Sequence, residues 1–255
     1  LAKRSAWLYA RGAMTHWDVP PFVREDLRQL QIELDDDRLT QLARYLAMLL
    51  EANQRTNLTA VREPEAAWRR LIIDSLTLLP GLEPLDAGAR LIDVGSGGGL
   101  PGVPVAIARP DLHVTLLEAT GKKARFLESC AHELPLPNVA VLHDRAEVVG
   151  QNPRHRQKYD LAMCRAIGPM SELLEYTLPL VKVGGRVLAM KGPKVEQELA
   201  HAGDALAKLG GGDLQVIEAY PPSFGLDLVI VSILKEHPTP KKYPRRPGEP
   251  RHDPL

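Results

Sequence analysis

The pattern of apolar and polar positions divides the chain from residue 84 onward into short strands and longer helices. Five apolar runs are short enough to be buried strands, and they lie at 91–94, 113–118, 138–142, 159–164 and 186–190. Between them, apolar residues recur at helical spacing at 103–108, 121–134, 171–181 and 195–209. This alternation predicts an α/β fold with a parallel, doubly wound sheet.

Two further strands close the pattern, at 214–220 and 228–234, with no helical stretch between them. Because parallel strands need a crossover connection, two strands joined directly pair antiparallel. We therefore expect a hairpin at the edge of a seven-stranded sheet, completing a domain that spans residues 84–235.

The first 83 residues have a helical pattern instead. Three acids at Asp35–Asp37 form an N-cap cluster, and leucines follow at steps of three and four. Pro64 fits the first position of a second amphipathic helix. We expect a helical cap at 31–83 after a loose extension at 1–30. The stretch Leu1–Trp17 has three basic residues and no acid, a composition that organelle transit peptides also show.

Asp74 and Ser75 interrupt the apolar face of this second helix. They are either a polar notch on the helix or a helix end that borders a ligand site. The pattern leaves both interpretations open.

A cluster of five glycines between Gly95 and Gly102 directly follows the strand at 91–94. Glycine has no Cβ and tolerates positive φ, so the main chain here can approach a ligand closely. The helix at 103–108 behind the turn offers unpaired N–H groups at its N-terminus. Strand, glycine turn and helix together predict a ligand-binding site.

Two ligand classes use such a turn. The stretch Gly97–Gly102 matches G-x-G-x-x-G, the dinucleotide fingerprint, but its first glycine lies three residues past Val94 instead of directly after the strand. The stretch Asp93–Gly99 fits D-x-G-x-G-x-G, which resembles motif I of class I S-adenosylmethionine (AdoMet) methyltransferases. The closing hairpin is usual in class I methyltransferases and absent from dinucleotide folds, so it also favours AdoMet over NAD.

Glu118 ends the strand at 113–118, 25 positions after Asp93. A carboxylate at about this separation accepts hydrogen bonds from ribose hydroxyls in nucleotide-binding sheets. NAD enzymes and methyltransferases both use it, so Glu118 supports a nucleoside ligand without naming it. The alternative is an ordinary strand-end carboxylate.

Ligands of open α/β sheets bind outside the carboxyl ends of the strands, which selects the loops there. The N–H of Ala146 and the carboxylate of Glu147 can read an adenine edge, although Glu147 can also simply start a helix. Arg165 can bind a cofactor carboxylate or a substrate phosphate in bidentate geometry. Further basic residues would line the same rim: Lys122, Lys123, Arg125 and Lys191. Such a rim favours a polyanion, with RNA the first candidate, although the two adjacent lysines alone can be a solvated charge run.

Composition limits the kinds of partner and the cellular compartment that we expect for this protein. The 255 residues are 44% hydrophobic and 25% charged, and the formal net charge is zero, so any basic surface must be local. Cys130 and Cys164 lack metal or C-x-x-C spacing and are expected to be reduced core residues of a cytoplasmic protein. No apolar run approaches the roughly 18 residues of a membrane span. We expect no metal and no membrane partner, and nothing in the pattern requires more than a monomer.

The tail at 236–255 is rich in proline, which argues against a helix or a central strand there. From Lys235 to Leu255, six basic residues stand against three acidic ones. We expect this tail to wrap the body in an extended form or to contact phosphates.

Several segments between Leu39 and Leu255 together resemble the bacterial ribosomal RNA small subunit methyltransferase G family, also called glucose-inhibited division protein B. The most specific are Gly99-Leu-Pro-Gly102, which extends motif I, and the ending Thr239-Pro-Lys-Lys-Tyr-Pro-Arg245. The other matching segments are Asn53-x-x-x-Asn57-Leu-Thr59, Asp74-Ser-Leu76, Gly121-Lys-Lys-Ala-Arg-Phe-Leu127, Arg145-Ala-Glu147, Arg165-Ala166 and Lys191-Gly192.

This resemblance implies a class I methyltransferase fold and AdoMet-dependent methylation of a guanine N7 in 16S rRNA, near the decoding site. The partner would be 16S rRNA, the small ribosomal subunit or its assembly intermediate. The expected cofactor residues are Gly95, Gly97, Gly99, Leu100, Glu118, Ala146, Glu147 and Arg165. The expected substrate residues are Asn57, Lys122, Lys123 and Lys191.

Three positions depart from the family pattern. Ala52 stands where the family usually has Trp, Leu71 where it has His, and Cys164 where it has Ser. The first two lie in the cap and bear on substrate contacts there, and none of the three touches motif I.

Guanine N7 has an in-plane lone pair and carries no proton at neutral pH. Methyl transfer to it from a sulfonium therefore needs no general base, and we assign no catalytic residue. We expect in-line displacement that depends on proximity and orientation. The alternatives are a class I methyltransferase with a protein or small-molecule acceptor and an NAD-dependent oxidoreductase. A non-enzymatic RNA-binding module would leave the glycine turn without a role.

Overall fold

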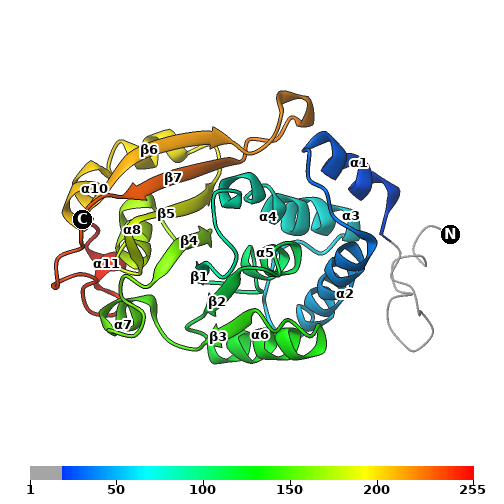
Figure 1. Ribbon diagram of the computed structural model, residues 1–255, viewed down its shortest axis with the longest axis horizontal. Helices are drawn as coiled ribbons and strands as arrows, with labels where there is room; N and C mark the ends of the chain where they lie inside the picture. The colour runs from blue at the N-terminus through cyan, green and yellow to red at the C-terminus, as the bar shows by residue number, and fades with distance from the viewer. Residues whose placement is uncertain (1–18) are drawn as a thin grey trace.

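The computed structural model describes residues 19–255, so the part of the expected loose extension at 1–18 lies outside the described residues. A seven-stranded sheet runs through the molecule in the order β3-β2-β1-β4-β5-β7-β6 (Figure 1). Its strands are β1 Arg90–Val94, β2 His113–Leu117, β3 Val139–Leu142, β4 Tyr159–Arg165, β5 Val181–Lys191, β6 Gly211–Glu218 and β7 Val229–Lys235. Strands β1 to β5 are parallel, whereas β7 pairs antiparallel with β5 and β6 antiparallel with β7. This confirms the seven-stranded fold with a closing hairpin.

Helices cover both faces of the sheet. On one face lie the cap helices together with α5 Gly102–Ala108 and α6 Gly121–Glu133, around a core that includes Leu42, Leu71 and Val105. The other face carries α7 Ala146–Gln151, α8 Met170–Thr177, α9 Val195–Leu199 and α10 Gly203–Leu209. Its core is formed by residues such as Leu173, Ala189 and Ile233. Both faces are closed, as the near-continuous apolar strands require.

The cap consists of α1 Pro21–Gln29, α2 Asp36–Ala52, α3 Pro64–Ala67, a π turn at Trp68–Ile73, α4 Asp74–Leu76 and a 3-10 turn at Leu79–Leu82. Helix α2 starts where the acidic cluster predicts, with the Asp35 side chain accepting from the N–H of Arg38. The second cap helix is not continuous. It widens into the π turn, where Leu71, Ile72 and Ile73 are all buried, which a helix presenting a single face does not allow.

The prediction of a loose segment up to residue 30 is wrong for α1. Val23 and Leu27 of this helix are buried against the cap. Asp26 also accepts from the Nε of Arg69 at 3.0 Å. The short helix is held by tertiary packing, which a helix of this length needs.

Several later elements differ from the predicted ranges, and β6 begins three residues earlier than expected, at Gly211. Helix α8 ends at Thr177, and β5 already begins at Val181, because Pro179 cannot continue a helix. The predicted helix at 195–209 breaks into α9 and α10, which are separated by three residues ahead of Gly203. The tail contains a one-turn helix, α11 Glu249–His252, where Pro250 occupies the first turn, the one helical position that tolerates proline.

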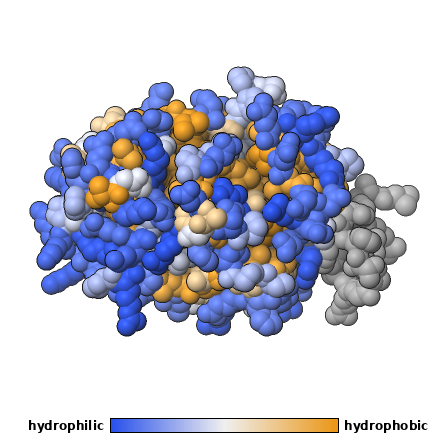
Figure 2. Space-filling model, in the orientation of Figure 1, coloured by the Kyte–Doolittle hydropathy of each residue, from blue (hydrophilic) through white to orange (hydrophobic). Residues whose placement is uncertain are grey.

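Hydrophilic residues cover most of the face shown in Figure 2, and apolar residues appear there in separate patches. Cys130 and Cys164 are buried free thiols, as predicted. Within residues 19–255, every helix is too short or too polar to cross a membrane.

Candidate functional site

The glycine turn lies at the carboxyl end of β1, beside the point where the strand order reverses between β1 and β4. Gly95, Gly97 and Gly99 have φ of +73°, +58° and +97°, so each adopts a backbone conformation that disfavours a side chain. A Cβ on Gly97 would meet nothing closer than the Gly95 carbonyl at 3.8 Å, an ordinary van der Waals distance, so this position is not crowded. A Cβ on Gly95 or Gly99 would instead lie within 2.7 Å of a neighbouring side chain. The turn thus combines tight packing with two solvent-accessible glycines, Gly95 and Gly97, whose main chain a ligand can approach.

Asp93 joins the end of β1 to the start of α5. Its Oδ2 accepts from the N–H of Gly102 at 3.0 Å, and a Cβ on Gly102 would lie 2.6 Å from the same oxygen. The side chain is fully buried, and this burial raises its pKa to about 7. Asp93 therefore fixes the shape of the turn through its hydrogen bond with Gly102, and it is not exposed to a ligand.

Glu118 follows β2 and reaches back to the same turn. Its Oε2 accepts from the N–H of Gly97 at 2.9 Å, and its Oε1 accepts from the N–H of Thr120 at 2.7 Å. A carboxylate has about four acceptor positions, so these two hydrogen bonds leave acceptor capacity on Glu118, which is 6% exposed. The structure thus brings Glu118 and the glycine turn into direct contact, as a nucleoside site requires.

The cap packs directly on the main chain of the turn. The hydroxyl of Tyr45 in α2 donates to the carbonyl of Gly98 at 2.7 Å. A Cβ on Gly98 would come 2.7 Å from Leu49 and 3.4 Å from Leu58, so only glycine fits without displacing them. Asn53 shapes the loop that carries Leu58, because its Oδ1 accepts from the N–H groups of Leu58 and Thr59. Asn57, an expected substrate residue, is exposed in this loop.

Arg165 ends β4, next in the sheet to β1. Its Nη2 lies 3.8 Å from Oδ2 of Asp74, while its Nη1 is buried without a hydrogen-bond partner. Asp74 accepts a second contact, a 2.6 Å hydrogen bond from the hydroxyl of Tyr220. Burial raises the pKa of Asp74 in spite of these two neighbours. The contacts of Asp74 fit a helix end beside a ligand site, whereas the Ser75 hydroxyl donates back to the Leu71 carbonyl, as a polar notch within the helix does.

Lys191 has partners within the chain. Its Nζ donates to the carbonyl of Gly168 at 2.7 Å and to Glu198 at 2.5 Å, and the side chain is only 8% exposed. Lys122 is exposed and Lys123 half-buried, both in the first turn of α6 after Glu118. The lysines of the predicted basic rim therefore differ: Lys191 is paired within the chain, whereas Lys122 and Lys123 of α6 reach the solvent.

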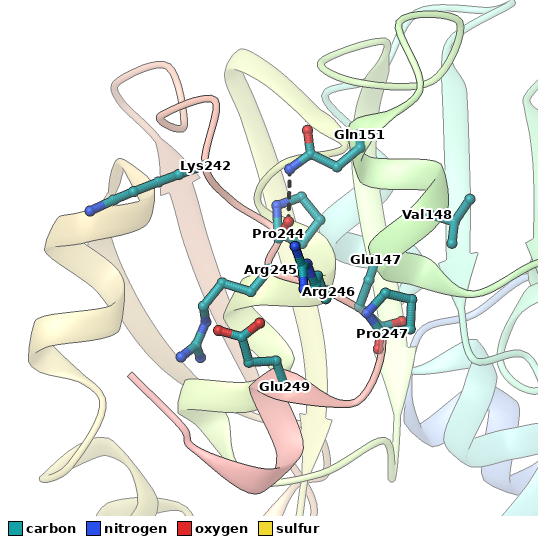
Figure 3. Close-up of a pocket in the computed structure, with 9 residues that line it drawn as sticks. All are labelled: Glu147, Val148, Gln151, Lys242, Pro244, Arg245, Arg246, Pro247 and Glu249. Carbon is teal, nitrogen blue, oxygen red and sulfur yellow. Dashed lines mark hydrogen bonds between the residues drawn. The ribbon is translucent and has the colours of Figure 1, made fainter.

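Ala146 and Glu147 begin α7 after β3, but the Glu147 carboxylate is engaged with the tail. Its Oε1 accepts from Arg145 and from the N–H of Gly248, each at 2.8 Å. Burial would raise the pKa of Glu147, yet these two donors lower it. Figure 3 shows Glu147 between the start of α7 and Pro247 of the tail, among the residues that line a pocket there. The Glu147 carboxylate, predicted to read an adenine edge, is thus already paired within the chain, and Ala146 beside it is half-buried.

The tail lies against the body through several strong contacts. Arg156 donates to four carbonyls, those of Gly150, Thr239, Pro240 and Tyr243, at 2.6 to 3.1 Å. Arg245 donates from its main chain and its guanidinium to Glu175, which is fully buried. Arg245, one of the basic residues of the tail, is therefore committed to the fold.

Sequence reasoning missed Tyr45 and Tyr220 as parts of this site, and it left the role of Asp74 open. Asp74 gave a signal, since it interrupts an apolar helix face. Tyr220 gave none, because it lies 146 positions from its partner. Among residues 19–255, no group of three or more His, Cys, Asp and Glu side chains is arranged to hold a metal ion.

Comparison with known proteins agrees with this geometry. The family model described as rRNA small subunit methyltransferase G matches residues 38–222. The ribosomal RNA small subunit methyltransferase G of Roseiflexus castenholzii is 44% identical over 226 residues, covering 88% of this chain and 94% of that protein. The protein of the same name from Leuconostoc citreum is 42% identical over 230 residues, covering 90% of this chain and 96% of the relative.

Among solved structures, a predicted O-methyltransferase from Agrobacterium tumefaciens has a TM-score of 0.50 and 19% sequence identity, covering 65% of this chain and 80% of that chain. This likeness concerns the fold alone. The family match over most of the chain, together with relatives above 40% identity, shows that the chain belongs to the rRNA small subunit methyltransferase G family.

Proposed function

We propose that this protein transfers a methyl group from AdoMet to N7 of a guanine in 16S rRNA near the decoding site, acting as a monomer in the cytoplasm. The observation that carries the proposal is the contact of Glu118 with Gly97, because it sets a carboxylate beside a solvent-accessible glycine of motif I. Family membership supplies the substrate class.

The residues of the site suit AdoMet in kind and charge. The uncrowded position at Gly97 accommodates a close ligand, and Glu118 keeps acceptor capacity for ribose hydroxyls. The buried, unpaired Nη1 of Arg165 suits an anionic oxygen. When bound, AdoMet would supply an electrophilic methyl group on its sulfonium.

The chain's own residues would bind and orient, without exchanging protons with the substrate. Guanine N7 presents a lone pair, so no side chain needs to remove a proton. The rate enhancement then comes from holding the acceptor in line with the methyl group. The cap would help by fixing the turn, through Tyr45 on Gly98.

The first experiment follows labelled methyl from AdoMet into 16S rRNA or small subunits that lack the modification, with the product mapped by cleavage specific for 7-methylguanosine. Label at one guanine N7 is the expected result. AdoMet binding without label in RNA would overturn the assigned substrate and leave the cofactor site intact. Binding of NAD in place of AdoMet would overturn both.

A matched pair of variants tests the cofactor role of Glu118. Glu118→Gln keeps the shape of the side chain and removes its charge, and we expect AdoMet affinity to fall about tenfold, as for a lost charge-assisted hydrogen bond. Glu128→Gln is the control, because it makes the same change on the exposed side of α6. Equal affinity in the two variants would contradict the assignment.

The lysines divide into two groups in this proposal. Lys122 and Lys123 would contact RNA phosphates, so alanine at both should weaken rRNA binding and reduce its salt dependence. Lys191→Ala should lower stability instead, because Glu198 would lose its partner in a partly buried pair. A reduced salt slope for Lys191→Ala would reverse this division.

A further inference from the structure

Arg165, Asp74 and Tyr220 form a chain of contacts that joins three separate parts of the fold. Arg165 ends β4, Asp74 begins α4 of the cap, and Tyr220 follows β6 of the closing hairpin. The strand register places all the strand ends involved at one edge of the sheet, since Arg165 pairs with Met190, Met190 with Ile230, and Ile230 with Ile217. The contact chain therefore crosses the carboxyl edge where a ligand would bind.

The two oxygens of Asp74 are used differently. Oδ1 accepts a short hydrogen bond from the Tyr220 hydroxyl, at 2.6 Å. Oδ2 lies 3.8 Å from Nη2 of Arg165, which is close enough for attraction and too long for a hydrogen bond. The hydrogen bond from Tyr220 thus fixes the Asp74 carboxylate, and the charge of that carboxylate orients the Arg165 guanidinium.

The Nη1 of Arg165 is the unusual atom of this group. It is buried and has no hydrogen-bond partner among the described residues. Native proteins rarely leave a buried charged donor unpaired, because its desolvation is not compensated. A donor kept in this state, at the ligand edge of the sheet, is suited to an acceptor that arrives with a ligand.

We infer that Tyr220 and Asp74 are positioning residues that hold the Arg165 guanidinium so that its free Nη1 meets an anionic oxygen of a ligand. This inference rests on the proposed function for the identity of that ligand. The oxygen belongs either to the carboxylate of AdoMet or to a phosphate of the RNA, and the guanidinium would bind both by the same chemistry.

Tyr220→Phe isolates the hydroxyl. The ring is 4% exposed and packs on Phe224 with centroids 5.2 Å apart, so phenylalanine keeps the packing. Tyr176→Phe is the matched control. Its hydroxyl also donates to a carboxylate, Glu172 at 2.8 Å, but it lies on α8 among the helices of the opposite face.

The experiment measures the Kd of AdoMet by calorimetry and the Kd of 16S rRNA by titration, for both variants and the wild type. We expect Tyr220→Phe to weaken one of these affinities about fivefold, the size of one net hydrogen bond, and Tyr176→Phe to change neither. A change in AdoMet affinity identifies the cofactor carboxylate, and a change in RNA affinity alone identifies a phosphate. Unchanged affinities in Tyr220→Phe would overturn the inference.

A second background tests whether Tyr220 acts through Arg165. In Arg165→Lys, the planar fork is lost, so adding Tyr220→Phe should cause no further loss of affinity. Fully additive losses would show that the tyrosine acts independently and would overturn the inference. Because both readouts are binding constants, a wild type that fails to methylate 16S rRNA would refute the proposed function and leave this test valid.

Discussion

The cap and the tail both pack against the sheet domain, but different forces hold them. The cap, drawn blue to cyan in Figure 1, rests on the glycine turn through apolar side chains such as Leu49 and Leu58. Its polar contact with the turn is the hydrogen bond from Tyr45 to Gly98. The tail, drawn red, is held by the guanidinium groups of Arg156 and Arg245.

The two regions differ in how many contacts share the stabilising free energy. Apolar burial is spread over many atoms, so a single small change on the cap removes little. A buried ion pair concentrates its contribution, because removing one partner leaves a charge in a poor solvent. We therefore expect the tail to respond more sharply than the cap to single polar substitutions.

The largest expected effect is at Arg245. Arg245→Ala leaves the fully buried Glu175 without its guanidinium partner, and we expect a loss of about 3 to 5 kcal/mol in the free energy of unfolding, measured by urea denaturation. Arg246→Ala is the control, because Arg246 is exposed and its loss should stay within about 0.5 kcal/mol. Similar losses for the two variants would remove the contrast between tail and cap.

The next effect is at Asp93, a buried carboxyl group of β1 next to the glycine turn on which the cap packs. Its pKa is about 7 in the folded protein, raised by burial from 3.8. Between about pH 4 and pH 7 the folded state keeps a proton that the unfolded state has released, so wild-type stability falls as pH rises through this window. Above pH 7 the full loss amounts to about 4 kcal/mol at most.

Asp93→Asn cannot ionise and should lack this component. The difference in unfolding free energy between the variant and the wild type should therefore grow in favour of the variant from pH 4 to pH 7, and then level off. Urea denaturation at pH 4.5, 6 and 8 measures it. A difference that is flat across these values would show that Asp93 does not titrate in the window.

The smallest effect is at the hydrogen bond between cap and turn. Tyr45→Phe keeps the ring and leaves the Gly98 carbonyl without this donor, and we expect a loss of about 1 kcal/mol in unfolding free energy. AdoMet affinity, measured on the same variant, should fall less than twofold, because the apolar contacts still hold the turn. A loss as large as that of Arg245→Ala would mean that the cap, too, depends on one polar contact.

Local chemistry determined much of what the sequence predicts correctly. The strand ends, the glycine turn and the closing hairpin follow from short apolar runs, from the lack of a Cβ and from the missing crossover helix, all within a few dozen residues. The position of Glu118 could also be predicted from the sequence, because a fixed separation within one strand-helix-strand unit brings it to the glycine turn.

Tertiary structure alone decided the rest, because these contacts join residues far apart in the chain. Lys191 has the expected position, but its Nζ donates to the carbonyl of Gly168, 23 positions earlier, which no spacing rule reveals. Glu147 likewise begins its helix as predicted, and only the return of the tail at Gly248 turns its carboxylate inward. The spacing of apolar residues and the secondary-structure propensity of a segment describe only what that segment does by itself. The pairing of a buried charge depends on which distant segment the folded chain brings to it, and that is settled only when the core closes.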